Sequence, residues 1–137
     1  MNIPVLDRSH YLKGLLITAK LDKQLSDKEK EIIKGISDKL GFATDFYNEI
    51  IRGLLSNQYI SDEPIKFSDK KIAESFLSDA IKLAYSDGNI SEAERNWLNE
   101  TARINSINEN FVQNKITSYK DSPVLLRNTE FALYSII

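Results

Sequence analysis

Apolar side chains recur along this chain at intervals of three and four residues, the spacing that places them on one face of an α-helix. No stretch shows the sustained two-residue alternation that is typical of a half-buried β-strand. The pattern predicts an all-α protein whose helices begin near residues 9, 26, 44, 68, 91, 108 and 122. Among the third helix's residues, Phe46, Tyr47, Ile50 and Ile51 are expected in the core.

Several of the expected helix ends are marked by their own residues. Ser26 with Glu29, and Ser91 with Glu94, each show the Ser-x-x-Glu pattern of a capping box, in which two side chains satisfy backbone amides at a helix start. Gly41 is placed to end the second helix in a left-handed conformation. Two further N-cap candidates are Ser68 and Asn108.

The two capping boxes belong to a longer internal repeat. Asp22 precedes the first box as Asp87 precedes the second, and the same offset of 65 residues aligns most of the expected core positions. The repeat covers about 9–57 and 68–120, and each copy alone would leave an apolar face open. We therefore expect one domain, 1–137, made of two pseudo-symmetric three-helix halves and a C-terminal helix.

Composition narrows the class of protein without naming a reaction. The 137 residues are 42% hydrophobic and 28% charged, as in ordinary globular domains, and the net charge of −2 gives no basic footprint for nucleic acid. With no cysteine and one histidine, thiol catalysis, disulfides and multi-histidine metal sites are excluded. No nucleophile–base pair, phosphate loop or cofactor fingerprint is visible, so we expect a non-enzymatic protein without an organic cofactor. The sequence shows neither signal peptide nor membrane span, and we expect a cytoplasmic location.

Asp22 and Asp87 are the residues that helix capping does not explain. Each lies near a helix C-terminus, where a carboxylate opposes the helix dipole at a cost of about 0.3–1 kcal/mol. The partner of each acid would be a set of loop amides, a lysine from the other half, or a bound cation. Oxygen ligands from Asp87, Asn89 and Glu94, and from Asp22 and Glu29 in the first turn, would suit a hard ion such as Ca²⁺ or Mg²⁺.

The stretch from Ala84 to Glu94 resembles a known signature. An EF-hand is excluded, because its first and third loop positions would be Leu83 and Tyr85, which cannot ligate through their side chains. The string Ala-x-x-Asp-Gly-x-Ile-Ser-x-x-Glu resembles the signature of TerB-like domains, which include the tellurite-resistance protein TerB and the N-terminal domain of the membrane-anchored co-chaperone DjlA. In the first half, Lys23 and Gln24 replace Gly and its polar neighbour, so the second turn is the better metal candidate.

The resemblance covers nearly the whole chain and implies an all-helical fold of two similar halves. It also implies a bacterial or phage stress-related protein that works through complexes, with acidic turns that bind metal. Our first hypothesis is thus a TerB-like domain that binds a protein partner, with a membrane-associated complex among the candidates and a divalent cation at the second turn. The alternative is a purely structural protein-interaction or self-association module without metal. The apolar end Phe131 to Ile137 is either buried or a docking surface, in which case the C-terminal helix would form a homo-oligomer.

Overall fold

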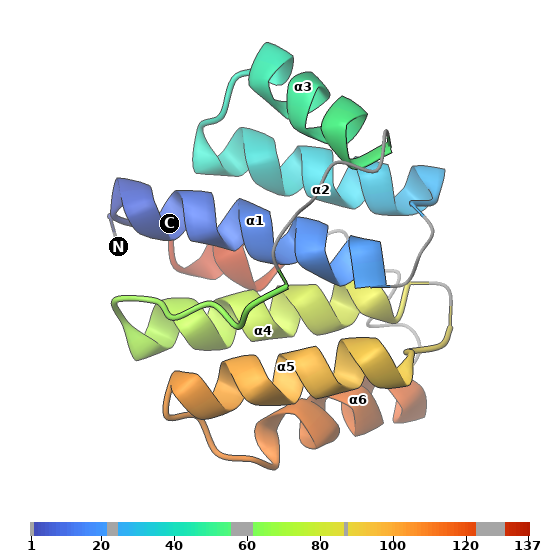
Figure 1. Cartoon of the computed structure of the whole chain (residues 1–137). Coiled ribbons are helices and arrows are strands. Elements are labelled where there is room, and N and C mark those ends of the chain that lie inside the picture. The colour runs from blue at the N-terminus through green and yellow to red at the C-terminus, as the bar shows by residue number, and fades with distance from the viewer. Residues whose placement is uncertain (1, 22–24, 56–61, 87, 123–130) are drawn as a thin grey trace.

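The structure is a computed structural model of the chain, and it describes every residue except 1, 22–24, 56–61, 87 and 123–130. Every regular element in these described residues is a helix, which confirms the all-α class. Figure 1 shows the α-helices stacked in the order α3, α2, α1, α4, α5 and α6. The elements are α1 Val5–Leu21, α2 Asp27–Leu40, α3 Thr44–Leu55, α4 Lys70–Ala84, α5 Glu92–Ile104, α6 Phe111–Asp121 and the 3₁₀-helix η1 Ala132–Ser135. No helix of the described part has the length and apolar character needed to cross a membrane.

Both capping boxes predicted from the sequence are present. At the start of α2, the Glu29 amide donates to Oγ of Ser26 at 3.1 Å, and the Ser26 amide donates to Oε1 of Glu29 at 3.2 Å. At the start of α5, the corresponding distances between Ser91 and Glu94 are 3.1 Å and 2.9 Å. Gly41 ends α2 with φ of 90°, the left-handed conformation expected of it.

The first helix begins earlier than the sequence predicted. We expected a helix from about Ser9, but α1 starts at Val5. The Pro4 carbonyl accepts a hydrogen bond from the Arg8 amide at 3.0 Å, so Pro4 opens the helix. Proline is tolerated at a helix start because the first amides have no partner within the helix.

Two other expected N-caps lie one or two residues from the observed ones. Asp69, not Ser68, caps α4, because its carboxylate accepts from the Lys71 amide at 2.7 Å. The α6 helix begins after Asn110, although the side chain of Asn108 accepts from the Asn110 amide at 2.8 Å. The predicted N-caps were therefore wrong by one position at α4 and by two at α6, where Asn110 makes no side-chain capping hydrogen bond.

The α1 and α4 helices form the centre of the molecule, where the first three helices meet the last three. Tyr11 of α1 and Phe76 of α4 are both fully buried, and their rings meet edge-to-face with centroids 5.4 Å apart. A Cβ atom on Gly14 would lie only 2.4 Å from Cζ of Phe76. Glycine at this position therefore allows the close approach of the two central helices.

The two outermost helices pack differently. The α6 helix lies against both α4 and α5, and its Val112 and Ile116 are buried. The α3 helix lies mainly against α2, where the Tyr47 hydroxyl donates to the Lys30 carbonyl at 2.9 Å. Part of α1 is consequently less covered than the corresponding part of α4, and the two-fold relation between two three-helix halves stays a prediction.

The C-terminal segment differs from the α-helix that we expected. Residues 131–137 contain only the short 3₁₀-helix η1, and its Leu133 is fully buried against α4. The carboxylate of Asp79 on α4 accepts hydrogen bonds from the amides of Ala132 at 2.6 Å and Leu133 at 3.1 Å. Asp79 thereby fixes the start of a tight turn and draws Leu133 into the core. The C-terminal α-helix proposed for homo-oligomer formation is therefore not found in this described segment.

Candidate functional site

The two capping boxes lie on the same side of the molecule, where α2 and α5 both begin (Figure 1). A lysine joins the two regions. Lys28, in the first turn of α2, donates from Nζ to the carbonyl of Ser86 at 3.3 Å, just after the end of α4. A positive charge from the first half of the chain thus reaches the second turn, where its partner is the Ser86 carbonyl. The expected pairing of a lysine with Asp87 lies outside the described residues.

The two glutamates of the boxes are buried. Glu29 is 4% exposed and Glu94 is 0% exposed, although both belong to the first turns of their helices. Each uses Oε1 to accept the amide of its box serine. These hydrogen bonds are those of helix capping, as expected from the Ser-x-x-Glu pattern.

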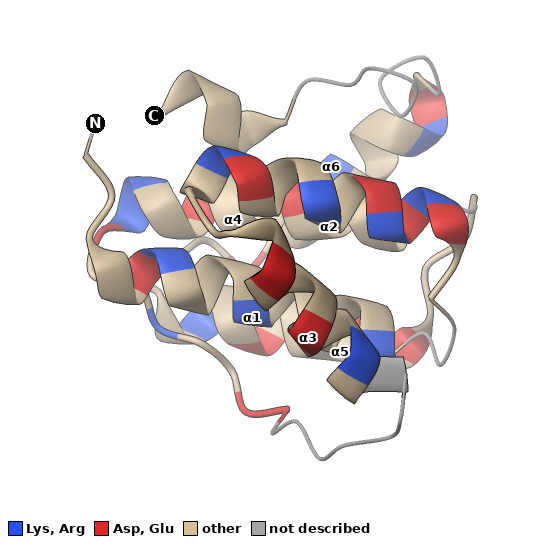
Figure 2. Ribbon diagram, turned by 90° about the horizontal axis from the view of Figure 1, so that it is seen from above, with Lys and Arg blue, Asp and Glu red and all other residues tan. Residues whose placement is uncertain are grey.

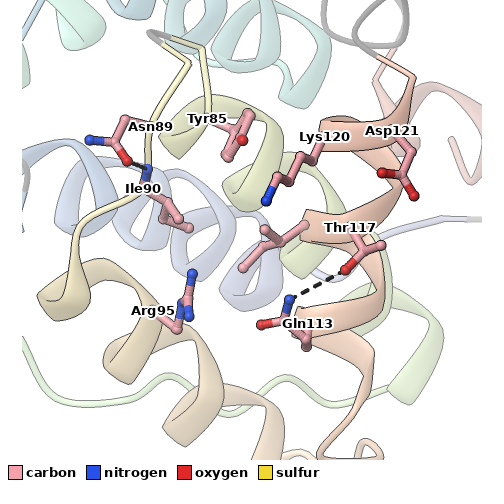
Figure 3. Close-up of a pocket in the computed structure, with 9 residues that line it drawn as sticks. Tyr85, Asn89, Ile90, Arg95, Gln113, Thr117, Lys120 and Asp121 are labelled. Carbon is pink, nitrogen blue, oxygen red and sulfur yellow. Dashed lines mark hydrogen bonds between the residues drawn. The ribbon is translucent and has the colours of Figure 1, made fainter.

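The predicted ligand Asn89 is turned toward its own backbone. Its side chain is exposed, and Oδ1 accepts a hydrogen bond from the Ile90 amide at 3.0 Å (Figure 3). Gly88 beside it has φ of 86°, a left-handed conformation that glycine adopts without strain. The other two predicted ligands, Asp87 and Asp22, lie outside the described residues.

The described residues of the second turn do not form a divalent-cation site by themselves. The exposed Asn89 and the fully buried Glu94 each place an oxygen on a backbone amide. No group of three or more Asp, Glu, His or Cys side chains in the described ranges is arranged to hold a metal ion. The ammonium group of Lys28 adds a positive charge beside the turn, which opposes a second cation. Metal binding that involves Asp87 or Asp22 stays a prediction of the sequence.

A polar cleft lies beside this turn, between the α4–α5 connection and α6 (Figure 3). Its volume is about 370 Å³. The residues around it are Tyr85, Asn89, Ile90, Arg95, Gln113, Ile116, Thr117, Lys120 and Asp121. The sequence offered no signal for this cleft, because its two walls are separated by all of α5 along the chain.

A second concave surface, apolar in character, lies between α1 and α3. We call it the α1–α3 groove; its volume is about 220 Å³, and it is lined by Ser9, Leu12, Lys13, Leu16, Phe42, Phe46 and Ile50. Phe46 was expected in the core, but it is 45% exposed and stacks on Phe42 with ring centroids 5.4 Å apart. The reason is that α3 packs mainly on α2, which buries Tyr47 and Ile51 and leaves Phe46 on the adjoining face.

Charges of opposite sign stand on the two sides of the α1–α3 groove. Lys13 lines it on α1, while Asp45 and Glu49 directly precede the lining residues Phe46 and Ile50 on α3. Figure 2 shows acidic residues on α3, with α1 behind it. All three charged side chains are exposed, and none of them forms an ion pair with another described residue.

One buried acid, Asp79, has hydrogen-bond partners that the sequence did not indicate. Asp79 is buried and accepts hydrogen bonds from the Tyr11 hydroxyl and from two C-terminal amides. Burial raises the pKa of Asp79 to about 6, while these hydrogen bonds and the charge of Lys82 limit the rise. Its partners are 68 and 53 residues away along the chain, so no local pattern could reveal them.

Comparisons of this chain with protein-family models, with curated proteins and with solved structures find no match. The structure itself defines an all-α domain with an apolar groove beside α3 and a polar cleft beside α6, toward opposite ends of the helix stack.

Proposed function

We propose that this chain is a TerB-like domain that acts by binding a protein and not by catalysis, and that the α1–α3 groove is its binding face. Phe46 carries the proposal, because a phenylalanine ring that is 45% exposed lies over a groove with a leucine floor. Fully burying such a side chain is worth about 1.5–3 kcal/mol relative to leaving it exposed. The apolar face continues one helical turn along α1 to Val5, which is 75% exposed.

A second copy of the chain is the partner that best suits the charges of this face. A two-fold symmetric interface brings the same surface of both copies together, and when its axis runs along the groove the α1 edge of one copy lies on the α3 edge of the other. Lys13 of each copy would then meet Asp45 and Glu49 of its partner. Complementary charges around an apolar centre fix the register of such an interface and accelerate association.

Local features support the TerB-like part of the proposal. Two capping boxes at equivalent positions, and three helices followed by three more, agree with the two-half fold that the resemblance implies. We extend the proposal to a pseudo-two-fold relation between these halves and to a role in a bacterial stress response such as tellurite resistance. A membrane-associated complex would be a second level of assembly, reached by the same domain.

Sedimentation velocity over a range of protein concentrations tests the proposed binding face. We expect the wild-type chain to shift toward a dimer as its concentration rises, and the variant Phe46→Asp to remain a monomer. Ile137→Asp is the matched control, since Ile137 is 49% exposed but lies at the C-terminal end. A monomeric wild-type chain at all concentrations, or an unchanged dimer in Phe46→Asp, would contradict the proposal.

A further inference from the structure

Two cations from different helices converge on the polar cleft beside α6. Arg95 belongs to α5 and Lys120 to α6, and Figure 3 shows the guanidinium and the ammonium groups directed into the same space. Neither side chain forms an ion pair with any residue that the structure describes. Two unpaired positive charges that share a cleft repel each other, and this repulsion is relieved when an anion lies between them.

Helix position explains Lys120 but not Arg95. Lys120 is in the last turn of α6, where a cation is favourable next to the negative end of the helix dipole. Arg95 follows Glu94 in the first turn of α5, at the positive end of its helix, where a cation is unfavourable. The charge of the exposed Arg95 at this helix end is therefore slightly unfavourable, and a bound anion would offset that cost.

The remaining walls of the cleft suit an anion with an apolar part. The Gln113 amide group donates to Oγ1 of Thr117 at 3.3 Å and has a second N–H for which no acceptor is found among the described residues (Figure 3). Two apolar residues also line the cleft, the buried Ile116 and the half-buried Ile90. The carboxylate of Asp121, the one acid of the described lining, points away from the cleft in Figure 3.

We propose that this cleft binds a small organic anion, with a phosphate or carboxylate group held by Arg95 and Lys120 and an apolar part against Ile90 and Ile116. The volume of about 370 Å³ lies in the range of sites for small ligands and exceeds what an inorganic anion would fill. Arginine and lysine both form charge-assisted hydrogen bonds to phosphate and carboxylate oxygens. This binding site is separate from the α1–α3 groove and does not depend on the function proposed for it.

Titration of the protein with phenyl phosphate, followed by calorimetry and by the side-chain amide NMR signals, tests the proposal. Benzoate is the carboxylate arm of the same experiment, and inorganic phosphate is the arm without an apolar part. We expect saturable binding of at least one aromatic anion, weaker binding of inorganic phosphate, and a shift of the Gln113 amide signals. Arg95→Gln and Lys120→Gln should each weaken binding about tenfold or more, since each removes a charge-assisted contact.

Arg103→Gln is the matched control, because Arg103 is an exposed arginine of α5 outside the cleft, paired with Glu100 at 2.8 Å. This variant should bind the aromatic anion as the wild-type protein does. The proposal would be overturned by the absence of saturable binding for both aromatic anions. It would equally be overturned if Arg95→Gln and Lys120→Gln bound no more weakly than Arg103→Gln, or if inorganic phosphate bound as tightly as phenyl phosphate.

Discussion

The hydroxyl group of Tyr11 donates a short hydrogen bond to the carboxylate of Asp79 across the buried contact between α1 and α4. The same carboxylate holds the amides of Ala132 and Leu133 at the C-terminal segment. One buried acid therefore joins three parts of the chain that are far apart in sequence. A buried carboxylate that loses a donor retains the cost of its removal from water, so the stability of this protein should depend strongly on the Tyr11 hydroxyl.

Replacing Tyr11 by phenylalanine should destabilise the fold by about 1–3 kcal/mol, because it leaves a buried, charged acceptor with one donor fewer. Urea denaturation gives the free energy of unfolding for this comparison. Tyr134→Phe is the control, since Tyr134 is half-buried and its hydroxyl has no hydrogen bond to the described residues. If both variants lost the same stability, the hydrogen bond from Tyr11 to Asp79 would not be a specific source of stability.

Stability should fall as the pH rises from about 4 to 6, through the ionisation of Asp79. Burial raises the pKa of this carboxyl from its ordinary value of 3.8 to about 6, so the folded protein holds the proton more tightly than the unfolded chain does. The stabilisation is complete below the unfolded pKa and is lost as the pH passes the folded pKa, and it amounts to about 3 kcal/mol at most. Asp79→Asn should remove this pH-dependent part of the free energy of unfolding, whether the substitution raises or lowers the stability at a fixed pH. Parallel pH–stability curves for the two proteins would contradict the assignment.

Replacement by alanine should change the stability of the protein in opposite directions at two glycines. Gly14→Ala would force a methyl group against the buried Phe76 ring, at 2.4 Å from its Cζ atom, and should destabilise the protein by about 1–3 kcal/mol. Gly35→Ala in α2 meets only the Tyr134 hydroxyl, at 3.7 Å, and should stabilise the helix by about 0.5–1 kcal/mol. Thermal unfolding of the two variants measures both signs. A neutral Gly14→Ala would mean that α1 and α4 are not packed as closely as described.

Calcium or magnesium at millimolar concentration should not raise the melting temperature in a saturable way. The oxygens of Asn89 and Glu94 are placed on backbone amides, and the ammonium group of Lys28 lies beside the turn. A ligand that binds the folded state raises its stability in proportion to the logarithm of its concentration above the Kd, so a cation site would be visible in this assay. A saturable rise that Asp87→Ala abolishes would instead support the cation site predicted from the sequence.

The parts of the fold that depend on neighbouring residues could be predicted from the sequence. Both capping boxes and the left-handed Gly41 were predicted, because their chemistry is confined to one helix end. Phe46 shows where such reasoning ends, since an apolar stripe predicts that a face is covered but not whether a helix of the same chain covers it. Asp79 shows the same for polar residues, because its three donors come from distant segments.

The candidate sites were predictable to different degrees. The sequence marked the acidic turn as a place where an acid needs a partner, and a lysine from the other half was among the partners considered, but Asp87 itself lies outside the described residues. It could not show that Lys28 is directed to Ser86, because that contact depends on how α2 and α4 meet. The Arg95 and Lys120 pair was invisible for the same reason, since only the packing of α6 against α5 brings the two charges together.

Reversing the charges on the α1–α3 groove tests the proposed self-association most directly. Lys13→Glu makes both edges of the groove acidic, and Asp45→Lys with Glu49→Lys makes both edges basic. Each variant alone should therefore repel its own copies and sediment as a monomer.

In a two-fold interface, however, every edge of the first variant opposes an edge of opposite charge on the second. An equimolar mixture of the two is predicted to form a one-to-one heterodimer in sedimentation velocity. A mixture that stays monomeric, or variants that dimerise alone as the wild-type chain does, would contradict the account.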